Sequence, residues 1–202
     1  MTKKGYVKKP TKPIEEHSSS ATAVHESESF RPMEQKELQD LVSKLKWETF
    51  CTHLRTYSPS LVRDFYANLY DHELEFIFVR KGLIPWDATK INELYNTKVD
   101  ADKHSEFIED ITDDKRDLLV TDLCAQGVLW TGSHQKNYTM HRCFLTLQSQ
   151  IWFYFLNCRL LPSTHSTTIN LDRMCLIHFI VKGRKIDVGT ILHQEIADWA
   201  VR

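Results

Sequence analysis

One stretch in the second half of the chain constrains the fold more than any other, because residues 141–161 carry apolar side chains on more than one side of a helix. The apolar residues that define it are Phe144, Leu145, Leu147, Ile151, Trp152, Phe153, Phe155 and Leu156. A helix that is apolar on several sides is stable only when other elements cover it. The sequence therefore predicts a central and most buried helix over His141–Leu161, which Pro162 ends.

Further helices are available to cover that central one. The chain has 202 residues, of which 42% are hydrophobic, so it can form a substantial core. Helical spacing and cap residues predict helices over 33–50, 58–69, 87–95, from Asp102 or Ser105 to 111, 115–126, 170–183 and 188–201. Ser58, Asp87 and Asn170 are suited to N-caps, while Gly127 and Gly183 are suited to left-handed C-terminal caps.

Only one short segment has the pattern of strands. Phe76–Val79 is aromatic and β-branched, and Leu83–Ile84 follows it after Lys81 and Gly82. This pair predicts a small hairpin as the only β structure, and residues 131–137 are expected to form a loop. The predicted fold class is mainly α: a compact multi-helix domain with one small β-hairpin and a disordered N-terminal tail.

The predicted tail comprises residues 1–32, and the helical domain comprises residues 33–202. Lysine, serine and glutamate dominate the tail, and so few large aliphatic residues cannot offset the entropy of ordering. Its candidate nucleic-acid contacts are Lys3, Lys4, Lys8, Lys9 and Lys12. These lysines suit phosphate contacts or nuclear import, although a solvated tail is the commoner role of such a cluster.

Charge, apolar runs and cysteine content indicate the compartment in which the protein is expected. The formal net charge is −1, so the chain as a whole favours neither nucleic acid nor an anionic membrane. No apolar run is long enough for a membrane span, and the start of the chain lacks the apolar stretch of a signal peptide. The five cysteines are widely spaced and predicted to be reduced core residues. An intracellular protein, in the nucleus or the cytoplasm, is expected.

Motifs for catalysis are absent from the sequence. Aspartic proteases need Asp-Thr/Ser-Gly, which does not occur. Polymerases need paired aspartates to hold metal ions, but the adjacent Asp113 and Asp114 lie in a polar run typical of a solvated helix end. The remaining candidates are Ser163 with His165 and Asp172, the pairs Cys51/His53, His141/Cys143 and Cys175/His178, and the loop Gly183–Gly189. None has the spacing of a nucleophile elbow, zinc site or phosphate loop. We expect no catalytic, cofactor or metal residues, and no enzyme activity.

Several motifs occur in the order found in a known family. They are the stretch Leu61–Asn68, Val79 and Arg80 with Gly82, Ile91 and Asn92 with Tyr95, Trp130, Trp152 with Phe155, Leu161 with Pro162, Arg173, and Ile186–Gly189. Over roughly Trp47–Ile196 the chain resembles the "putative plant transposon protein" domain of gypsy-class retroelements in plants. Lys81 interrupts the Arg-Gly pair that is common there. The family supplies no catalytic residues.

The resemblance implies a non-enzymatic domain of a plant transposable-element protein, acting in self-association or in packaging of the element's nucleic acid. The alternative is a host protein-interaction module, and a cryptic nuclease ranks third. Partners are therefore the protein itself, nucleic acid through the tail, or another protein. The residues themselves lead to two structural expectations. Four arginines, Arg63, Arg80, Arg159 and Arg173, are expected to form structural pairs, for instance with Asp64 or Asp187. Three tryptophans, Trp47, Trp152 and Trp199, are expected to anchor the core.

Overall fold

The computed structural model describes residues 32–52, 57–69, 75–97, 99–134, 137–163 and 167–200. All of them belong to one compact unit that begins at Arg31. The predicted tail and its five candidate lysines lie outside the described residues, except for Pro32. The helical domain can therefore be described by itself.

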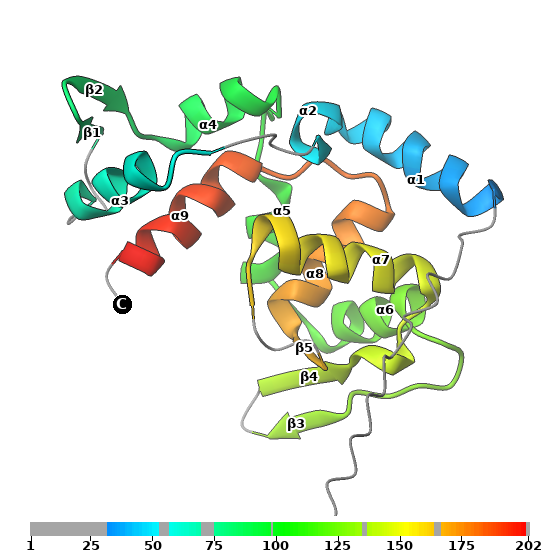
Figure 1. The fold of residues 1–202 in the computed structure, drawn as a ribbon. Coiled ribbons are helices and arrows are strands. Elements are labelled where there is room, and N and C mark those ends of the chain that lie inside the picture. Colours follow the sequence, from blue (N-terminus) through cyan, green and yellow to red (C-terminus); the bar gives the residue numbers. More distant parts are fainter. Residues whose placement is uncertain are drawn as a thin grey trace, which may run out of the picture. The chain divides into compact units, whose positions relative to one another are not determined.

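The elements follow one another in the order shown in Figure 1. The helices are α1 (Pro32–Leu45), α2 (Glu48–Cys51), α3 (Pro59–Asn68), α4 (Ala88–Tyr95), α5 (Lys103–Glu109), α6 (Asp113–Leu123), α7 (Leu147–Phe155), α8 (Leu171–Val181) and α9 (Val188–Ala200). A short 3₁₀ helix, η1 (Arg142–Phe144), precedes α7, and a π-helical turn, η2 (Leu156–Leu160), continues it. The strands are β1 (Phe76–Val79), β2 (Gly82–Pro85), β3 (Gly132–His134), β4 (Asn137–His141) and β5 (Thr168–Asn170). The predicted mainly helical fold class is confirmed.

Side-chain caps fix several helix starts where the sequence predicted them. The carboxylate of Asp87 accepts a hydrogen bond from the amide of Lys90 at 2.8 Å, and Asp102 accepts one from Ser105 at 3.2 Å. Asn170 caps α8 in the same way, by accepting from the amide of Arg173 at 3.1 Å. Each cap satisfies a helix N–H that would otherwise lack a partner.

The most buried helix is α8, which corrects the prediction for residues 141–161. Every residue from Met174 to Ile180 is buried, and α8 contacts α5, α6, α7 and the strands β4 and β5. In Figure 1, α7 lies against α8. Trp152 and Phe153 of α7 are buried, but Tyr154 is 70% exposed. The core therefore centres on α8, and α7 covers one side of it.

A second sheet replaces the loop predicted at 131–137 and the beginning of the helix predicted at 141. Strands β3 and β4 form an antiparallel pair, and β4 also pairs with β5, so that Met140 lies opposite Ile169. Both of these side chains are fully buried beneath α8. The helical pattern failed here because β4 finds its partner, β5, about thirty residues later in the chain, which local spacing cannot reveal. Gly127 has the predicted left-handed φ of 79°, but it lies in a turn after α6.

A smaller apolar cluster holds the hairpin β1–β2 against α3, α4 and α9. Its buried members are Leu69, Ile77, Val79, Trp86 and Ile91. Among the described helices, none combines the length and apolar character needed to cross a bilayer. The hairpin thus packs one face against this cluster, and its other face forms part of the surface of the domain.

Candidate interaction surface

The hairpin β1–β2 has two apolar faces, and one of them is covered along β1, although Ile84 of β2 on that face is 42% exposed. Phe78 lies opposite Leu83, and Phe76 lies opposite Pro85, so these four side chains share one face. We call this set the hairpin face. Ile77 and Val79 alternate with them and are buried against the small cluster.

The exposure of the hairpin face is large for such residues. Phe76 is 48% exposed, Phe78 is 54% exposed and Leu83 is 64% exposed, whereas Ile77 between the two phenylalanines is fully buried. A single exposed apolar residue is ordinary, but a cluster of large ones on one small element marks an interaction site. Strand β1 pairs only with β2 in the described part of the chain, so the pair forms a sheet with open edges.

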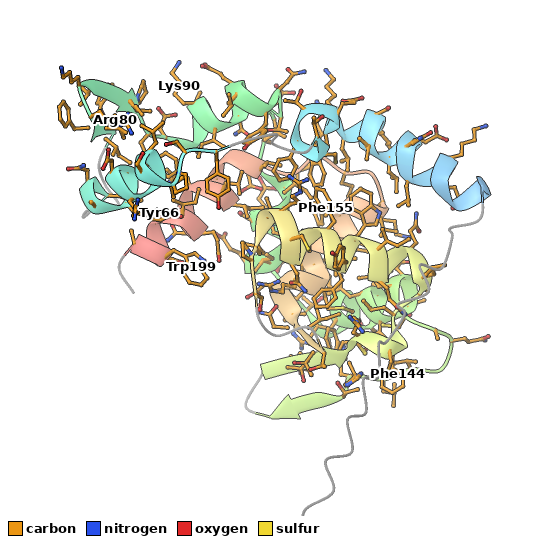
Figure 2. All side chains as sticks on the ribbon, in the orientation of Figure 1. Tyr66, Arg80, Lys90, Phe144, Phe155 and Trp199 are labelled. Carbon is orange, nitrogen blue, oxygen red and sulfur yellow. The ribbon has the colours of Figure 1, made fainter. Side chains whose placement is uncertain are left out.

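The tip of the hairpin is fixed to α3. Arg80 takes a left-handed φ of 57° in the turn between the strands. Its guanidinium donates a hydrogen bond to the hydroxyl of Ser60 at 2.7 Å and lies 3.5 Å from the carboxylate of Asp64. Figure 2 shows Arg80 at this end of the hairpin, near α3. These contacts orient the hairpin face before any partner arrives, which lowers the entropy lost on binding.

Charges of opposite sign lie at the two ends of the hairpin. The tip carries Arg80 and the exposed Lys81, while the open end carries the exposed Glu75 and the half-buried Asp87. The amide of Trp86 donates to the carbonyl of Glu75 at 2.7 Å and thus closes this end. Because Asp64 pairs with Arg80 and Asp87 caps α4 beside Lys90, the basic end depends on Lys81 and the acidic end on Glu75.

An apolar groove of about 430 Å³ lies between α3, α4, α9 and η2. Aromatic side chains line it, among them Tyr66, Trp86 and Trp199. Figure 2 shows Tyr66 on α3 and Trp199 on the neighbouring α9. Trp199 was predicted to be a core anchor, which is wrong: it is 48% exposed, and its indole N–H donates to the carboxylate of Glu195 at 2.8 Å. Burial, with a contribution from the charge of Glu195, raises the pKa of Tyr66.

A second, larger cleft of about 780 Å³ is lined mainly by charged residues of α5, the first turn of α6 and the loop after α8. Its cations are Lys103, Lys115, Arg184 and Lys185, and its carboxylates are Asp100, Glu106 and Asp110. Lys115 pairs with Asp110 at 2.8 Å, and Arg184 lies over the ring of Phe179 at 5.4 Å. With four cations against three carboxylates, the cleft is only weakly basic.

Buried titratable groups are present, but they are enclosed. His178 is 1% exposed, and its Nε2 lies 2.9 Å from the carboxylate of Asp122, which Lys182 also contacts at 2.8 Å. Burial alone would raise the pKa of Asp122, yet hydrogen bonds from Lys182 and His178 outweigh it and lower that pKa. Burial lowers the pKa of His178. The cluster ties α6 to α8, and His178 lies at its buried end, while the Lys182 side chain is 41% exposed.

Among the described residues, those weighed as catalytic or metal sites do not gather into one. Asp113 pairs with Arg116 in the first turn of α6, as expected of a solvated helix start. Within the described ranges, no group of three or more ligand side chains is placed to hold a metal ion. His53 and His165 lie outside those ranges.

The cysteines divide into two groups, which corrects part of the prediction. Cys124 and Cys175 are buried and Cys51 is half-buried, whereas Cys143 and Cys158 are exposed. Burial raises the pKa of Cys51 and Cys124 to about 11 and that of Cys175 to about 12, so these thiols stay protonated.

Structural pairing of the predicted kind is seen at Arg80 and Arg173. Arg80 pairs with Asp64, as expected. Arg173 does not meet a carboxylate; it donates to the carbonyl of Leu161 at 2.9 Å and to the side-chain oxygen of Asn157. Trp47 and Trp152 are core anchors, with ring centres 6.2 Å apart. Trp47 also stacks on Phe155, which Figure 2 shows on α7.

Two motifs distant in sequence meet between α4 and α9. The side-chain amide of Asn92 donates to the carboxylate of Asp187 at 2.7 Å, and its oxygen accepts from the amide of Gly189 at 2.8 Å. The same oxygen accepts from the hydroxyl of Thr97 at 2.8 Å. This arrangement fixes the register of two helices that are almost one hundred residues apart.

A comparison with known protein families finds a match over most of the chain. Residues 43–202 match the model of a family described as a "putative plant retrotransposon-related domain". The chain belongs to this family. The predicted resemblance to plant transposable-element proteins is thereby confirmed. No curated protein and no solved structure matches the chain.

The structure explains several motifs of this retrotransposon-related domain as packing devices. Asn92 and Gly189 join α4 to α9, and Arg173 fastens the end of η2 to α8. The exposed hairpin face was not predicted from the sequence. The signal was nevertheless present, since Phe76–Val79 is apolar at every position and a two-stranded hairpin can bury only one face.

Proposed function

We propose that this retrotransposon-related domain is a non-enzymatic assembly module, and that copies of it associate through the hairpin face. The observation that carries the proposal is the exposure of Phe76, Phe78 and Leu83 on one face of a hairpin that α3 holds in place. The rim of this face carries both signs of charge, in Arg80 and Lys81 and in Asp64 and Glu75. Such a rim suits a partner of mixed charge better than a polyanion.

The expected association is weak and depends on concentration. Fully burying a phenylalanine or leucine side chain is worth about 1.5–3 kcal/mol, and these residues are already about half covered in the monomer. Six such side chains in a dimer contribute about 6 kcal/mol, which is comparable with the cost of bringing two molecules together. The hairpin face alone therefore supports only weak association, which many copies held in one particle would strengthen.

The test is sedimentation equilibrium of the full chain over a concentration series. The double variant Phe78→Thr/Leu83→Thr removes apolar area while keeping residues that favour strands. We expect the wild type to associate and the double variant to stay monomeric. Leu129→Thr is the matched control, because Leu129 is 82% exposed in a loop after α6 and lies outside the hairpin face.

A host protein is the alternative partner for the same face. In that case the wild type stays monomeric at all concentrations in the test above, and a host protein binds the wild type but not the double variant. A wild type that is monomeric and binds nothing through the hairpin face would refute the assembly role.

Packaging of nucleic acid is a second candidate, favoured by the charged cleft and by the lysines of the tail. Lys103, Arg184 and Lys185 can contact phosphates, and the tail adds Lys3, Lys4, Lys8, Lys9 and Lys12. Fluorescence anisotropy with a labelled single-stranded RNA over a salt series tests this. Arg184→Ala/Lys185→Ala and a variant with the five tail lysines changed to Gln separate the two contributions. Equal binding by the wild type and both variants would exclude these contacts, and a wild type that does not bind would exclude this candidate.

A further inference from the structure

The hairpin carries a charge pattern that is complementary to itself. Arg80 and Lys81 occupy the tip, the hairpin face occupies the middle, and Glu75 and Asp87 occupy the open end. Two such hairpins attract each other along their whole length only when they point in opposite directions. The basic tip of each then lies beside the acidic open end of the other.

We propose that two copies of this chain pack hairpin face to hairpin face, antiparallel, about a two-fold axis. This inference rests on the self-association proposed above and specifies its geometry. A two-fold axis makes the contact isologous, so each tip-to-open-end contact occurs twice. Near the axis, Phe76, Phe78 and Leu83 of one copy cover the same residues of the other, which removes the exposed apolar area from water.

The opposite orientation is disfavoured by the same charges. If the tips lay together, Lys81 of each copy would face Lys81 of the other, and Glu75 would face Glu75. Like charges placed opposite each other repel. A partner of a single sign would be attracted at one end of the hairpin and repelled at the other. A second copy carries both signs of charge and is therefore attracted at both ends at once.

Charge exchange at Glu75 and Lys81 provides the test, because Arg80 is already engaged by Ser60 and Asp64. Glu75→Lys and Lys81→Glu are each made in the full chain, and so is the double variant with both changes. Lys36→Glu and Glu37→Lys are the matched controls: they change the net charge equally at exposed positions of α1. Dimerisation is measured by sedimentation equilibrium at low ionic strength.

In the antiparallel dimer, each single exchange turns both end contacts from attraction to repulsion. We expect each to weaken dimerisation at least about fivefold relative to its matched control. An equimolar mixture of the two single variants should regain dimers near the wild-type affinity. In the mixed dimer, the new basic side chain of the Glu75→Lys copy meets the new acidic side chain of the Lys81→Glu copy, and the unchanged Lys81 and Glu75 meet at the other end. The double variant, which has the same net charge as the wild type, should regain dimers as well.

Two results would overturn the antiparallel geometry. One is that the single exchanges weaken association no more than the α1 controls do. The other is that neither the mixture nor the double variant restores it. Either result, obtained while Phe78→Thr/Leu83→Thr still abolishes dimers, removes the geometry but leaves self-association standing. A wild type without dimers removes both proposals together.

Discussion

At the scale of single residues, buried imidazoles link the stability of the domain to pH. His104 and His178 are both buried, and burial lowers the pKa of each below its ordinary value of 6.5. The unfolded chain therefore binds more protons than the folded chain once the pH falls below that value. The contribution of these two imidazoles to the free energy of unfolding should be constant above it and should decrease as the pH falls through and below it.

His104 is the better position at which to test this linkage. Its Nε2 is buried and has no hydrogen-bond partner among the described residues, and its ring packs edge-on against Phe179 at 5.3 Å. His104→Leu removes an unpaired polar atom, so the change in stability at neutral pH should be below about 1 kcal/mol. Urea unfolding at about pH 7.5 and about pH 5.5 should show a smaller loss for the variant than for the wild type. Equal losses would show that His104 does not contribute.

The close approach of α4 to α9 leaves no room for a side chain at Gly189. A Cβ atom at this position would lie 2.1 Å from the carbonyl oxygen of Ala88 and 2.5 Å from the side-chain nitrogen of Asn92. Gly189→Ala should therefore force the helices apart and lower the free energy of unfolding by about 1–3 kcal/mol.

Gly82 provides the control for this substitution, because the nearest atom to its Cβ position, the carbonyl oxygen of Val79, is 3.8 Å away. Gly82→Ala should change stability by less than about 1 kcal/mol in the same urea titration. If the two variants were equally stable, the close packing of α4 on α9 would be contradicted.

At the scale of elements, local signals predicted the helices well wherever a cap residue was present. Asp87, Asp102 and Asn170 begin α4, α5 and α8 as expected, because a cap depends only on residues three positions apart. The hairpin was predicted for a similar reason, since its two strands are adjacent in sequence.

Prediction failed where an element depends on distant contacts. Strand β4 pairs with its neighbour β3 and also with β5, which follows α7 in the chain and which local spacing cannot reveal. The prediction that α7 forms the centre of the fold also failed, because an apolar sequence shows that a helix is covered but does not rank it against α8. The groove is a product of tertiary packing, so residue spacing alone could not define it, whereas the all-apolar run Phe76–Val79 did carry a signal for the hairpin face.

The attachment of the hairpin to α3 can be tested at Arg80. Arg80→Asn keeps a residue that tolerates the left-handed conformation but loses the contacts with Asp64 and Ser60. Because the ion pair is exposed, we expect global stability to fall by less than about 1 kcal/mol. Hydrogen exchange of the amides in β1 and β2 should nevertheless become faster than in the control Arg63→Asn, an exposed position of α3. Unchanged exchange would show that the small apolar cluster alone holds the hairpin.

At the scale of the whole molecule, the described part of this retrotransposon-related domain is a helical body centred on α8, with a hairpin that exposes an apolar face. The motifs shared with the family serve the body, in the α4–α9 contact and at Arg173. The exposed face serves no purpose in the monomer that the structure reveals. We propose that a second copy of the chain covers it.

Hydrogen exchange of the full chain at low and high protein concentration tests that claim most directly. If copies associate through the hairpin face, amides of residues 75–87 should become protected as the concentration rises, while those of α8 should not change. The variant Phe78→Thr/Leu83→Thr should lose the concentration dependence. Exchange in residues 75–87 that is independent of concentration, or protection that appears only on other elements, would contradict the account.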